Sequence, residues 1–500
     1  MSGERRDPTL ALNQDSLGLL GDRVTVPGYD RDDVTPGIVH LGVGGFHRAH
    51  EAFYVDRLLR QGLAGEWGIC GVGLLPQDSL MRDVMAAQDR LYTLVQRHPD
   101  GTVEAQVIGS IVDYLFAPDD PDRVVERMAS PDVRIVSMTV TEGGYNLRSD
   151  GEFDGDDPAV RRDLEPGAAP TTVFAFVTEA LGRRRERGID PFTVVSCDNL
   201  EENGEKARNA FTSYARLKDP ALADWMADRV AFPSSMVDRI TPATTDGDRA
   251  LVADSLGVQD AWPVVCEPYH QWVIQDDFTA GRPPWEEAGV QLVPDVRPYE
   301  LMKLRLLNAS HQVMGYLGSL AGYGYVHDVC RDPDFVALLR GYMEREATPT
   351  LDPVPGVDLG DYRSSLLERF TNEAIGDTLA RQCVDSTERI PKFLLPVVRQ
   401  RLQDGGEIDR AALAIAGWAR HAEGVDDAGR PLEVVDVRRD QVLALARQQQ
   451  DDPTAMLGLS MFDGLREDRR FVTTYVAALR TLHEHGARAA VARYAGSSGD

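Results

Sequence analysis

The chain has little positive charge for its size and no long hydrophobic run. Lysine and arginine number 53 against 80 aspartate and glutamate residues, a formal net charge of −27 over 500 residues. A field of that sign repels nucleic acid and anionic lipid surfaces. The longest apolar runs, such as 411–419, are far shorter than the roughly 20 residues that cross a bilayer. The first 35 residues contain no apolar core of signal-peptide length. We therefore expect a cytoplasmic protein without nucleic-acid or membrane partners.

Cysteine and lysine are also scarce. The five cysteines are far apart and form no C-x-x-C pair, so neither a disulfide framework nor a thiolate zinc site is expected. Arginine supplies nearly all of the positive charge. The lysines are Lys206, Lys218, Lys303 and Lys392. Because a lysine can release its proton at a workable pH and an arginine cannot, a retained lysine is a candidate for chemistry.

The chain divides into two regions with different secondary-structure patterns. Short apolar strand patterns at 37–43, 67–73, 133–141 and 192–197 alternate with helical patterns at 50–61, 78–88 and 171–187. This alternation predicts a parallel α/β sheet over residues 1–294, with a surface loop at the acidic, Gly- and Pro-rich segment 151–170. From residue 295 to 500 the patterns are mostly helical, which predicts a second, helical domain.

A glycine turn follows the first strand pattern directly. In Gly42-Val-Gly-Gly-Phe-His-Arg48, Gly42 can make the turn and Gly44 can let the backbone approach a pyrophosphate at a helix N-terminus. His47 holds the place of the third fingerprint glycine, so a tight turn without a ligand is the alternative. Asp78 is the nearest carboxylate after the second strand, which suggests a ribose contact and hence NAD. His47 and His50 lack a third ligand, so no metal is expected.

A second candidate site lies in the helical pattern that opens at Pro298. An α-helix turns by about 100° per residue, so its polar residues would share an arc of about 140°: Glu300, Lys303, Asn308 and His311. Apolar neighbours would lower the pKa of Lys303, as a general base requires. Asn308 can donate a hydrogen bond to an alkoxide, and His311 can hold a hydroxyl. The alternative is an amphipathic helix with an ordinary solvated face.

Polar residues also follow later strand patterns. Asn199 comes after the strand at 192–197, and Thr141-Glu142 after the strand at 133–141, where doubly wound sheets present their ligands. Asn199 can equally be a loop residue or a helix cap. Asp238, within residues 232–239, is open to the same two interpretations.

Four segments together resemble the polyol-specific long-chain dehydrogenases, the mannitol dehydrogenase family. They are the glycine loop, residues 196–204, residues 232–239 and the spacing Lys303-x4-Asn308-x2-His311, in the family's order. The resemblance covers residues 37 to about 400. It implies a Rossmann-type N-terminal domain and a helical C-terminal domain like that of 6-phosphogluconate dehydrogenase. The residues expected to contact the cofactor are then Gly42, Gly44, Gly45, Phe46, His47, Arg48, Asp78, Thr141 and Glu142.

The same resemblance implies roles for the polar residues. Lys303 would be the general acid or base, and Asn199 and Asn308 would stabilise the alkoxide. His311 would orient the substrate, and Glu300 would control the escape of the proton to water. Residues expected at the substrate's hydroxyls are Asp238, Arg381 and Arg389. Arg389 stands where the family's pattern has a lysine, so the contacts at the far end of the polyol are open.

The implied reaction is a metal-independent, NAD-dependent interconversion of D-mannitol and D-fructose by a monomer. NADP is the alternative cofactor, and D-arabinitol, D-sorbitol and fructuronate are alternative substrates. An alternative of another class is a non-catalytic dinucleotide-binding sensor. A sensor needs no base, so the joint presence of Lys303, Asn308 and His311 argues against it.

Overall fold

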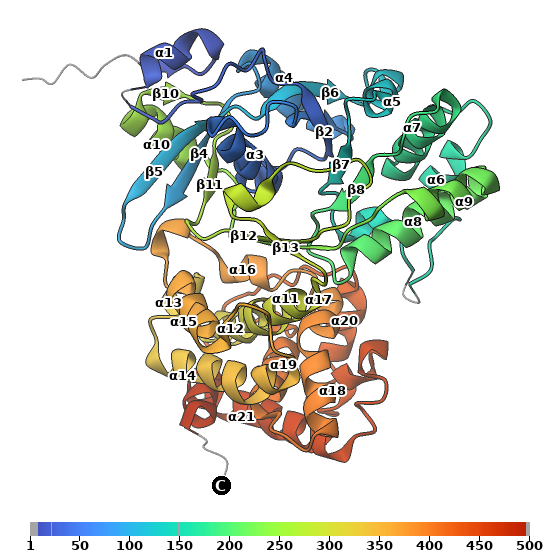
Figure 1. The fold of residues 1–500 in the computed structure, drawn as a ribbon. Helices are drawn as coiled ribbons and strands as arrows, with labels where there is room; N and C mark the ends of the chain where they lie inside the picture. Colours follow the sequence, from blue (N-terminus) through green and yellow to red (C-terminus); the bar gives the residue numbers. More distant parts are fainter. Residues whose placement is uncertain (1–8, 22, 149–150, 497–500) are drawn as a thin grey trace, which may run out of the picture. The chain divides into compact units, whose positions relative to one another are not determined.

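The computed structural model describes residues 9–21, 23–148 and 151–496. The chain divides into two compact units, Met1–Arg297 and Pro298–Asp500, which the colours of Figure 1 separate as blue to yellow and yellow to red. The break falls where the chain passes from mixed strands and helices to a nearly continuous succession of helices.

A five-stranded parallel sheet forms the centre of unit 1, in the order β6-β3-β2-β7-β8. Its strands are β2 (Pro36–Leu41), β3 (Gly68–Gly73), β6 (Ile111–Phe116), β7 (Ile135–Met138) and β8 (Thr193–Ser196). The chain proceeds from β2 to β3 on one side and later returns to β7 on the other. The strand order therefore reverses around β2, and ligands bind parallel sheets at the carboxyl ends of strands at such a point. This confirms the predicted Rossmann-type fold.

Both faces of this sheet are covered, which explains why most residues of its strands are apolar. Alternate residues of β2 face opposite cores: Val39 lies with the helices α5, α7 and α8, and Ile38 lies with α3 and α4. The helices of unit 1 are α1 (Leu17–Leu20), α2 (Gly45–Ala49), α3 (Glu51–Arg60), α4 (Ser79–Ala87), α5 (Pro121–Ala129), α6 (Pro158–Asp163), α7 (Val173–Arg187), α8 (Asn203–Lys218), α9 (Pro220–Arg229) and α10 (Asp246–Leu256).

Three smaller sheets complete unit 1, and the sequence patterns did not indicate them. Their strands are β1 (Leu10–Ala11), β4 (Tyr92–Arg97), β5 (Val103–Ile108), β9 (Ser235–Asp238), β10 (Val258–Gln259), β11 (Val264–Cys266), β12 (Gln271–Gln275) and β13 (Gln291–Val293). Only β4 and β5 form a local antiparallel pair, whereas β11 reaches back to β4 and β12 pairs with both β9 and β13. Apart from β4 and β5, these strands are two to five residues long and leave little local pattern.

The expectation of a simple loop at residues 151–170 was wrong in part, because α6 lies within it. The Asp157 carboxylate accepts hydrogen bonds from the amides of Ala159 and Val160, and Pro158 occupies the first turn. Val160 is fully buried. The capping residue and the proline were readable signals of a helix start, but the surrounding glycines obscured them.

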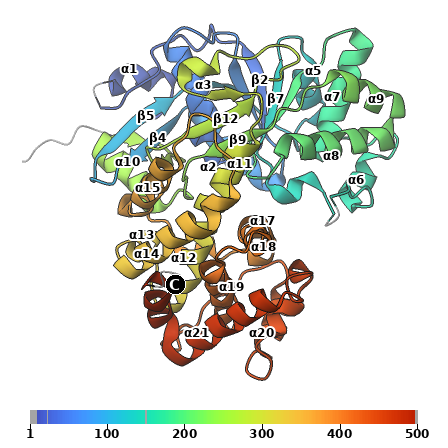
Figure 2. The ribbon, with the colours of Figure 1, turned by 60° about the horizontal axis from the view of Figure 1, so that its bottom comes forward.

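Unit 2 is helical, and its described residues form β-bridges only in isolation. Its helices are α11 (Arg297–Met302), which starts at the unit boundary, α12 (Ala309–Leu320), α13 (Val326–Val329), α14 (Pro333–Gly341), α15 (Leu359–Phe370), α16 (Leu379–Gln382), α17 (Ser386–Phe393), α18 (Leu395–Gln403), α19 (Asp409–His421), α20 (Arg439–Ala446) and α21 (Arg469–Gly496). Every residue of α12 is buried. It packs on α19, and α19 packs on α21 (Figure 2). Among the described residues, no helix combines the length and apolar character needed to span a membrane.

Candidate active site

The turn after β2 has a backbone that only glycine accommodates. Gly42 has φ +93°, and a Cβ there would lie 2.4 Å from the Thr139 carbonyl oxygen. Gly44 caps the N-terminus of α2, and no atom lies within 4 Å of where its Cβ would be. A Cβ at Gly45 would meet only the methyl group of Thr241, at 3.8 Å. The loop thus offers backbone amides and open space to a phosphate group.

The three residues after these glycines turn their side chains toward the protein. Phe46 stacks on His50, and His47 stacks on His40. The Arg48 guanidinium is buried, donates to the Trp262 carbonyl, and lies over the ring of Tyr92. Any direct cofactor contact at Phe46, His47 or Arg48 therefore falls to the backbone, and these side chains support the loop by packing.

Behind the loop lies a buried polar cluster that sequence reasoning missed. The Glu51 carboxylate accepts a hydrogen bond from Ser137 at 2.8 Å and lies 2.9 Å from His40 Nδ1 and 3.2 Å from His47 Nδ1. Burial alone would raise the pKa of Glu51, but its contacts with the two histidines outweigh burial and hold that pKa far below its usual range. Burial, with His40 nearby, lowers the pKa of His47 to about 4.

His40 links this cluster to the glycine turn. Its Nδ1 lies 2.8 Å from the Ser137 hydroxyl, and its Nε2 lies 3.0 Å from the Thr139 hydroxyl. Thr139 in turn donates to the Gly42 carbonyl at 2.7 Å. The cluster therefore supports the turn at Gly42 through His40 and Thr139.

His40, His47 and Glu51 are also close enough together to be considered as a metal site. The two imidazole rings, however, are stacked with centroids 3.4 Å apart and planes 15° from parallel. A metal ion lies near the plane of each imidazole that binds it, and nearly parallel planes do not converge on one ion. The geometry therefore suits a hydrogen-bonded network better than a metal centre.

Asp198 joins the loops that follow β7 and β8. Its carboxylate accepts hydrogen bonds from the amides of Val140 and Thr141, at 3.1 and 2.9 Å, and from the Tyr145 hydroxyl. Thr141 has φ 65° and ψ 167°, a conformation that glycine adopts far more readily. Asn199 directly follows Asp198 and is exposed. The structure therefore brings the segments of Thr141 and Asn199 together. The side chain of Glu142 lies outside the described part of the chain.

Asp78 lies in the 3-10 turn Pro76–Asp78, which follows the carboxyl end of β3. Its Oδ2 accepts hydrogen bonds from the amides of Leu74 and Leu75, both at 2.9 Å. The carboxylate thus shapes the loop that would face a ribose.

Asp238 ends β9 and is buried. The next residue, Arg239, donates to the Ala49 carbonyl at the end of α2. This contact places the Asp238 segment beside the glycine-loop helix.

In unit 2, the predicted α-helix from Pro298 is interrupted by a π-helical turn, Lys303–Asn308 (hereafter the π turn). A π-helix bonds residue i to residue i+5, so Asn308 lies one turn above Lys303 on the same face. The uniform α-helical projection was therefore wrong in this segment, and the polar residues gather more closely than it implied. Glu300, Lys303 and His311 are 5%, 7% and 8% exposed, so this face is not an ordinary solvated one.

The surroundings of Asn308 and His311 indicate a site for a polar ligand. Asn308 Oδ1 is buried and has no hydrogen-bond partner among the described residues. Buried acceptors are nearly always satisfied in native proteins, so such an atom needs a partner. The His311 ring packs against Phe370, with centroids 4.8 Å apart, which limits its rotation.

Arg381 and Arg389 lie next to each other on α16 and α17. The Arg381 guanidinium donates two hydrogen bonds, of 2.8 and 2.9 Å, to the Asp377 carboxylate. Arg389 donates to the carbonyls of Arg381 and Gln382. Helix α16 packs on α12, the helix that carries His311. Asp377, which sequence reasoning missed, fixes the direction of Arg381.

Comparison with known proteins agrees with this geometry. Residues 36–287 match the family model of the mannitol dehydrogenase Rossmann domain, and residues 295–483 match that of the mannitol dehydrogenase C-terminal domain. The chain is 48% identical to mannitol 2-dehydrogenase of Phaeosphaeria nodorum, over 97% of this chain and 86% of that protein. It is 44% identical to mannitol 2-dehydrogenase of Aspergillus fumigatus, over 97% of this chain and 99% of that protein.

Two solved structures are similar over nearly the whole chain. One is Pseudomonas fluorescens mannitol 2-dehydrogenase in a ternary complex with NAD and D-mannitol, at 43% identity and a TM-score of 0.90, covering 97% of this chain and 99% of that one. The other is a D-sorbitol dehydrogenase in substrate-free form, at 39% identity and a TM-score of 0.88, covering 96% and 100%.

Proposed function

Given that the chain belongs to the mannitol dehydrogenase family, we propose that it interconverts D-mannitol and D-fructose. Its class, an NAD-dependent polyol dehydrogenase, follows from the family and from the similar enzyme solved with NAD. The observation that carries the finer proposal is the face shared by the buried Lys303 and His311 and by Asn308, whose Oδ1 is buried, in a chain 43% identical to an enzyme solved with D-mannitol.

The residues of unit 1 suit a dinucleotide. The amides around Gly44 and Gly45, in open space at the start of α2, would hold the pyrophosphate. Asp78 would accept hydrogen bonds from the adenosine ribose, and the Thr141–Glu142 segment would lie at the strand end nearer the nicotinamide. When bound, NAD supplies the hydride acceptor for the substrate's C2.

The chain's own groups handle the proton and the alkoxide. In oxidation Lys303, as a neutral amine, takes the proton of the C2 hydroxyl. The amide of Asn308 donates a hydrogen bond to the alkoxide that forms, and the resemblance assigns Asn199 the same part. His311 holds a neighbouring hydroxyl, and Glu300, three residues before Lys303 and equally buried, passes the proton toward water.

The rest of the polyol requires groups that recognise hydroxyls. Asp238 can accept hydrogen bonds from them, and Arg381, oriented by Asp377, can donate to them. Arg389 gives this end a planar guanidinium in place of the family's lysine, which changes the donor geometry but keeps the charge.

Initial rates with NAD and NADP over D-mannitol, D-sorbitol, D-arabinitol and fructuronate test the proposal. We expect the highest kcat/KM with D-mannitol and NAD. D-Sorbitol is the second candidate substrate, because a D-sorbitol dehydrogenase is 39% identical to this chain. A higher kcat/KM for any other polyol would replace D-mannitol, and cofactor binding without turnover would favour a sensor.

Asp78→Asn tests the cofactor preference, because it removes the charge but keeps an oxygen for the amides of Leu74 and Leu75. We expect it to weaken NAD binding more than NADP binding, since a 2′-phosphate no longer meets a carboxylate. Equal effects on both cofactors would remove Asp78 from the ribose site.

Activity should also survive chelation, since two amides and a lysine would take the place of a metal ion. Incubation with EDTA should leave kcat unchanged, and loss of activity that zinc restores would contradict this.

A further inference from the structure

The π turn is held at its middle by a segment some 40 residues later. The Tyr342 hydroxyl donates to the Arg305 carbonyl oxygen at 3.1 Å, and the Arg305 guanidinium donates to the Thr350 carbonyl. Arg305 lies between Lys303 and Asn308, the two residues that the turn aligns. The two ends of segment 342–350 therefore both form hydrogen bonds with one residue of the turn, Arg305.

This segment is itself well fixed. It consists of a second π-helical turn, Tyr342–Ala347, followed by a short 3-10 turn, Thr348–Thr350. The hydroxyls of Thr348 and Thr350 donate to carbonyls within the segment, at 2.6 Å each. The buried Glu346 carboxylate accepts hydrogen bonds from the amides of Arg410 and Ala411, at 2.8 Å each. The segment is thereby anchored to the start of α19.

We propose that Tyr342 is a positioning residue for polyol oxidation, which holds the π turn so that Lys303 and Asn308 act on the same substrate oxygen. The proposal rests on the proposed function, because it takes Lys303 as the base. Tyr342 is fully buried, and its hydroxyl reaches the turn through the Arg305 carbonyl.

The physical argument concerns register. A π turn is rare and persists where surrounding contacts impose it. If the Arg305 carbonyl loses the hydrogen bond from Tyr342, the turn can relax toward α-helical spacing, which rotates Asn308 away from Lys303 around the helix axis. A displacement of about 1 Å at a reacting group can cost about 100-fold in rate. The cofactor's pyrophosphate loop belongs to unit 1, so NAD binding should be unaffected.

The test compares Tyr342→Phe with Tyr475→Phe. Tyr475 is also fully buried in unit 2, and its hydroxyl has no hydrogen-bond partner among the described residues. The measurements are kcat and kcat/KM for D-mannitol against pH, the dissociation constant of NADH, and the unfolding temperature. We expect Tyr342→Phe to lower kcat by about 10- to 100-fold and to move the midpoint of the pH profile, with NADH affinity unchanged. Tyr475→Phe should match the native enzyme.

Arg305→Met loosens the same turn from its other contact and should lower kcat in the same direction, which keeps the test decisive if Tyr342→Phe folds poorly. Lys303→Arg is measured alongside. Near-native rates in Lys303→Arg would mean that the proposed base is wrong. An inactive Lys303→Arg, with Tyr342→Phe equal to Tyr475→Phe in kcat and pH profile, would overturn the positioning role and leave the proposed function standing.

Discussion

The candidate functional residues of unit 1 differ in kind from those of unit 2. In unit 1 the candidate binding groups are mostly backbone groups: a glycine turn, strand ends and loop amides. The carboxylates of Glu51, Asp78 and Asp198 support them through hydrogen bonds. In unit 2 the side chains of one helix do the work, and a π turn sets their alignment. Unit 1 should therefore be most sensitive to added volume, and unit 2 to changes of proton chemistry and register.

The largest effect is expected at the lysine. Lys303→Arg keeps the charge but cannot accept a proton, so kcat for D-mannitol oxidation should fall by about 10² to 10⁴ with NAD binding little changed. In the native protein kcat/KM for oxidation should rise with pH through one ionisation as the base loses its proton, and this rise should disappear in the variant. Steady-state kinetics checks this, with Lys392→Arg as the control. Near-native kcat in Lys303→Arg would leave unit 2 without a base.

The buried Glu346 of unit 2 should make the free energy of unfolding depend on pH. Burial raises the pKa of this carboxyl to about 7, so between about pH 4.5 and 7 the folded chain holds a proton that the unfolded chain has released. The contribution of this proton to the free energy of unfolding is fully present below about pH 4.5. It is lost, by roughly 3 kcal/mol, as the pH rises to about 7. Urea unfolding of the native protein and Glu346→Gln from pH 5 to 8 should show this slope only in the native protein. Parallel slopes would contradict the prediction.

Two glycine substitutions distinguish an added methyl group that disturbs the fold from one that blocks only the cofactor. In Gly42→Ala the Cβ would meet the Thr139 carbonyl at a positive φ, so both stability and NAD affinity should fall, each by about 1–3 kcal/mol. In Gly44→Ala the Cβ meets no protein atom, so the unfolding temperature should hold while NAD affinity falls. Calorimetry and NADH titration check both. Unchanged NADH affinity in Gly44→Ala would remove the pyrophosphate from this loop.

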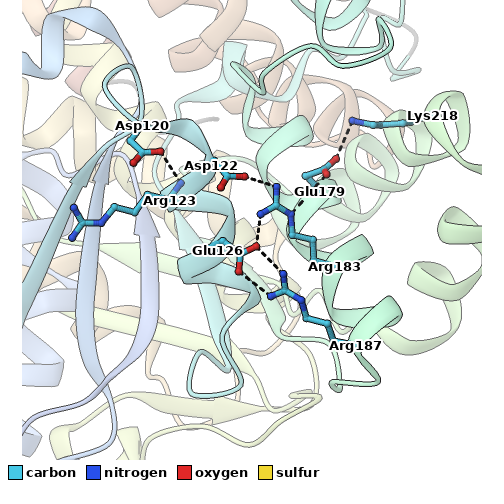
Figure 3. A network of polar contacts seen from close by, with 8 residues as sticks. All are labelled: Asp120, Asp122, Arg123, Glu126, Glu179, Arg183, Arg187 and Lys218. Atoms are coloured by element: carbon cyan, nitrogen blue, oxygen red, sulfur yellow. Dashed lines mark hydrogen bonds and ion pairs between the residues drawn. The ribbon is translucent and has the colours of Figure 1, made fainter.

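The smallest effect is expected on the surface of unit 1, where Glu126 of α5 lies between Arg183 and Arg187 of α7 (Figure 3). Hydrogen bonds from Arg187 and Arg183 lower the pKa of Glu126 to about 2, so its contribution is present above about pH 4.5 and is lost as the pH falls toward 2. Because the side chain is 42% exposed, Glu126→Gln should cost less than about 1 kcal/mol, and less still at high salt. Thermal unfolding at two salt concentrations checks this, and a larger, salt-independent loss would show that the network supports the core.

Much of the fold could be predicted because buried parallel strands and amphipathic helices leave local patterns. Four of the five strands of the central sheet, at 37–43, 67–73, 133–141 and 192–197, were found in this way, whereas β6 was missed. The smaller sheets were missed, since β11 finds its partner in β4, far back along the chain. The supporting residues Glu51, Asp198 and Asp377 were missed for a related reason: a carboxylate that holds imidazoles, backbone amides or a guanidinium looks like any surface acid in a sequence.

The sequence by itself determined the chemistry available to this protein. Gly42 was readable as a turn glycine because it directly follows an apolar strand pattern and opens a G-x-G, and Lys303 stood out because arginine supplies nearly all the other positive charge. Only the tertiary structure decided how Lys303 and Asn308 align. A helical projection assumes that every residue rotates by the same angle around the helix axis. Here the hydrogen bond from Tyr342 and the contact with Thr350 hold a π turn at Arg305. The spacing of these side chains is thus set by contacts some 40 residues away, which no local pattern records.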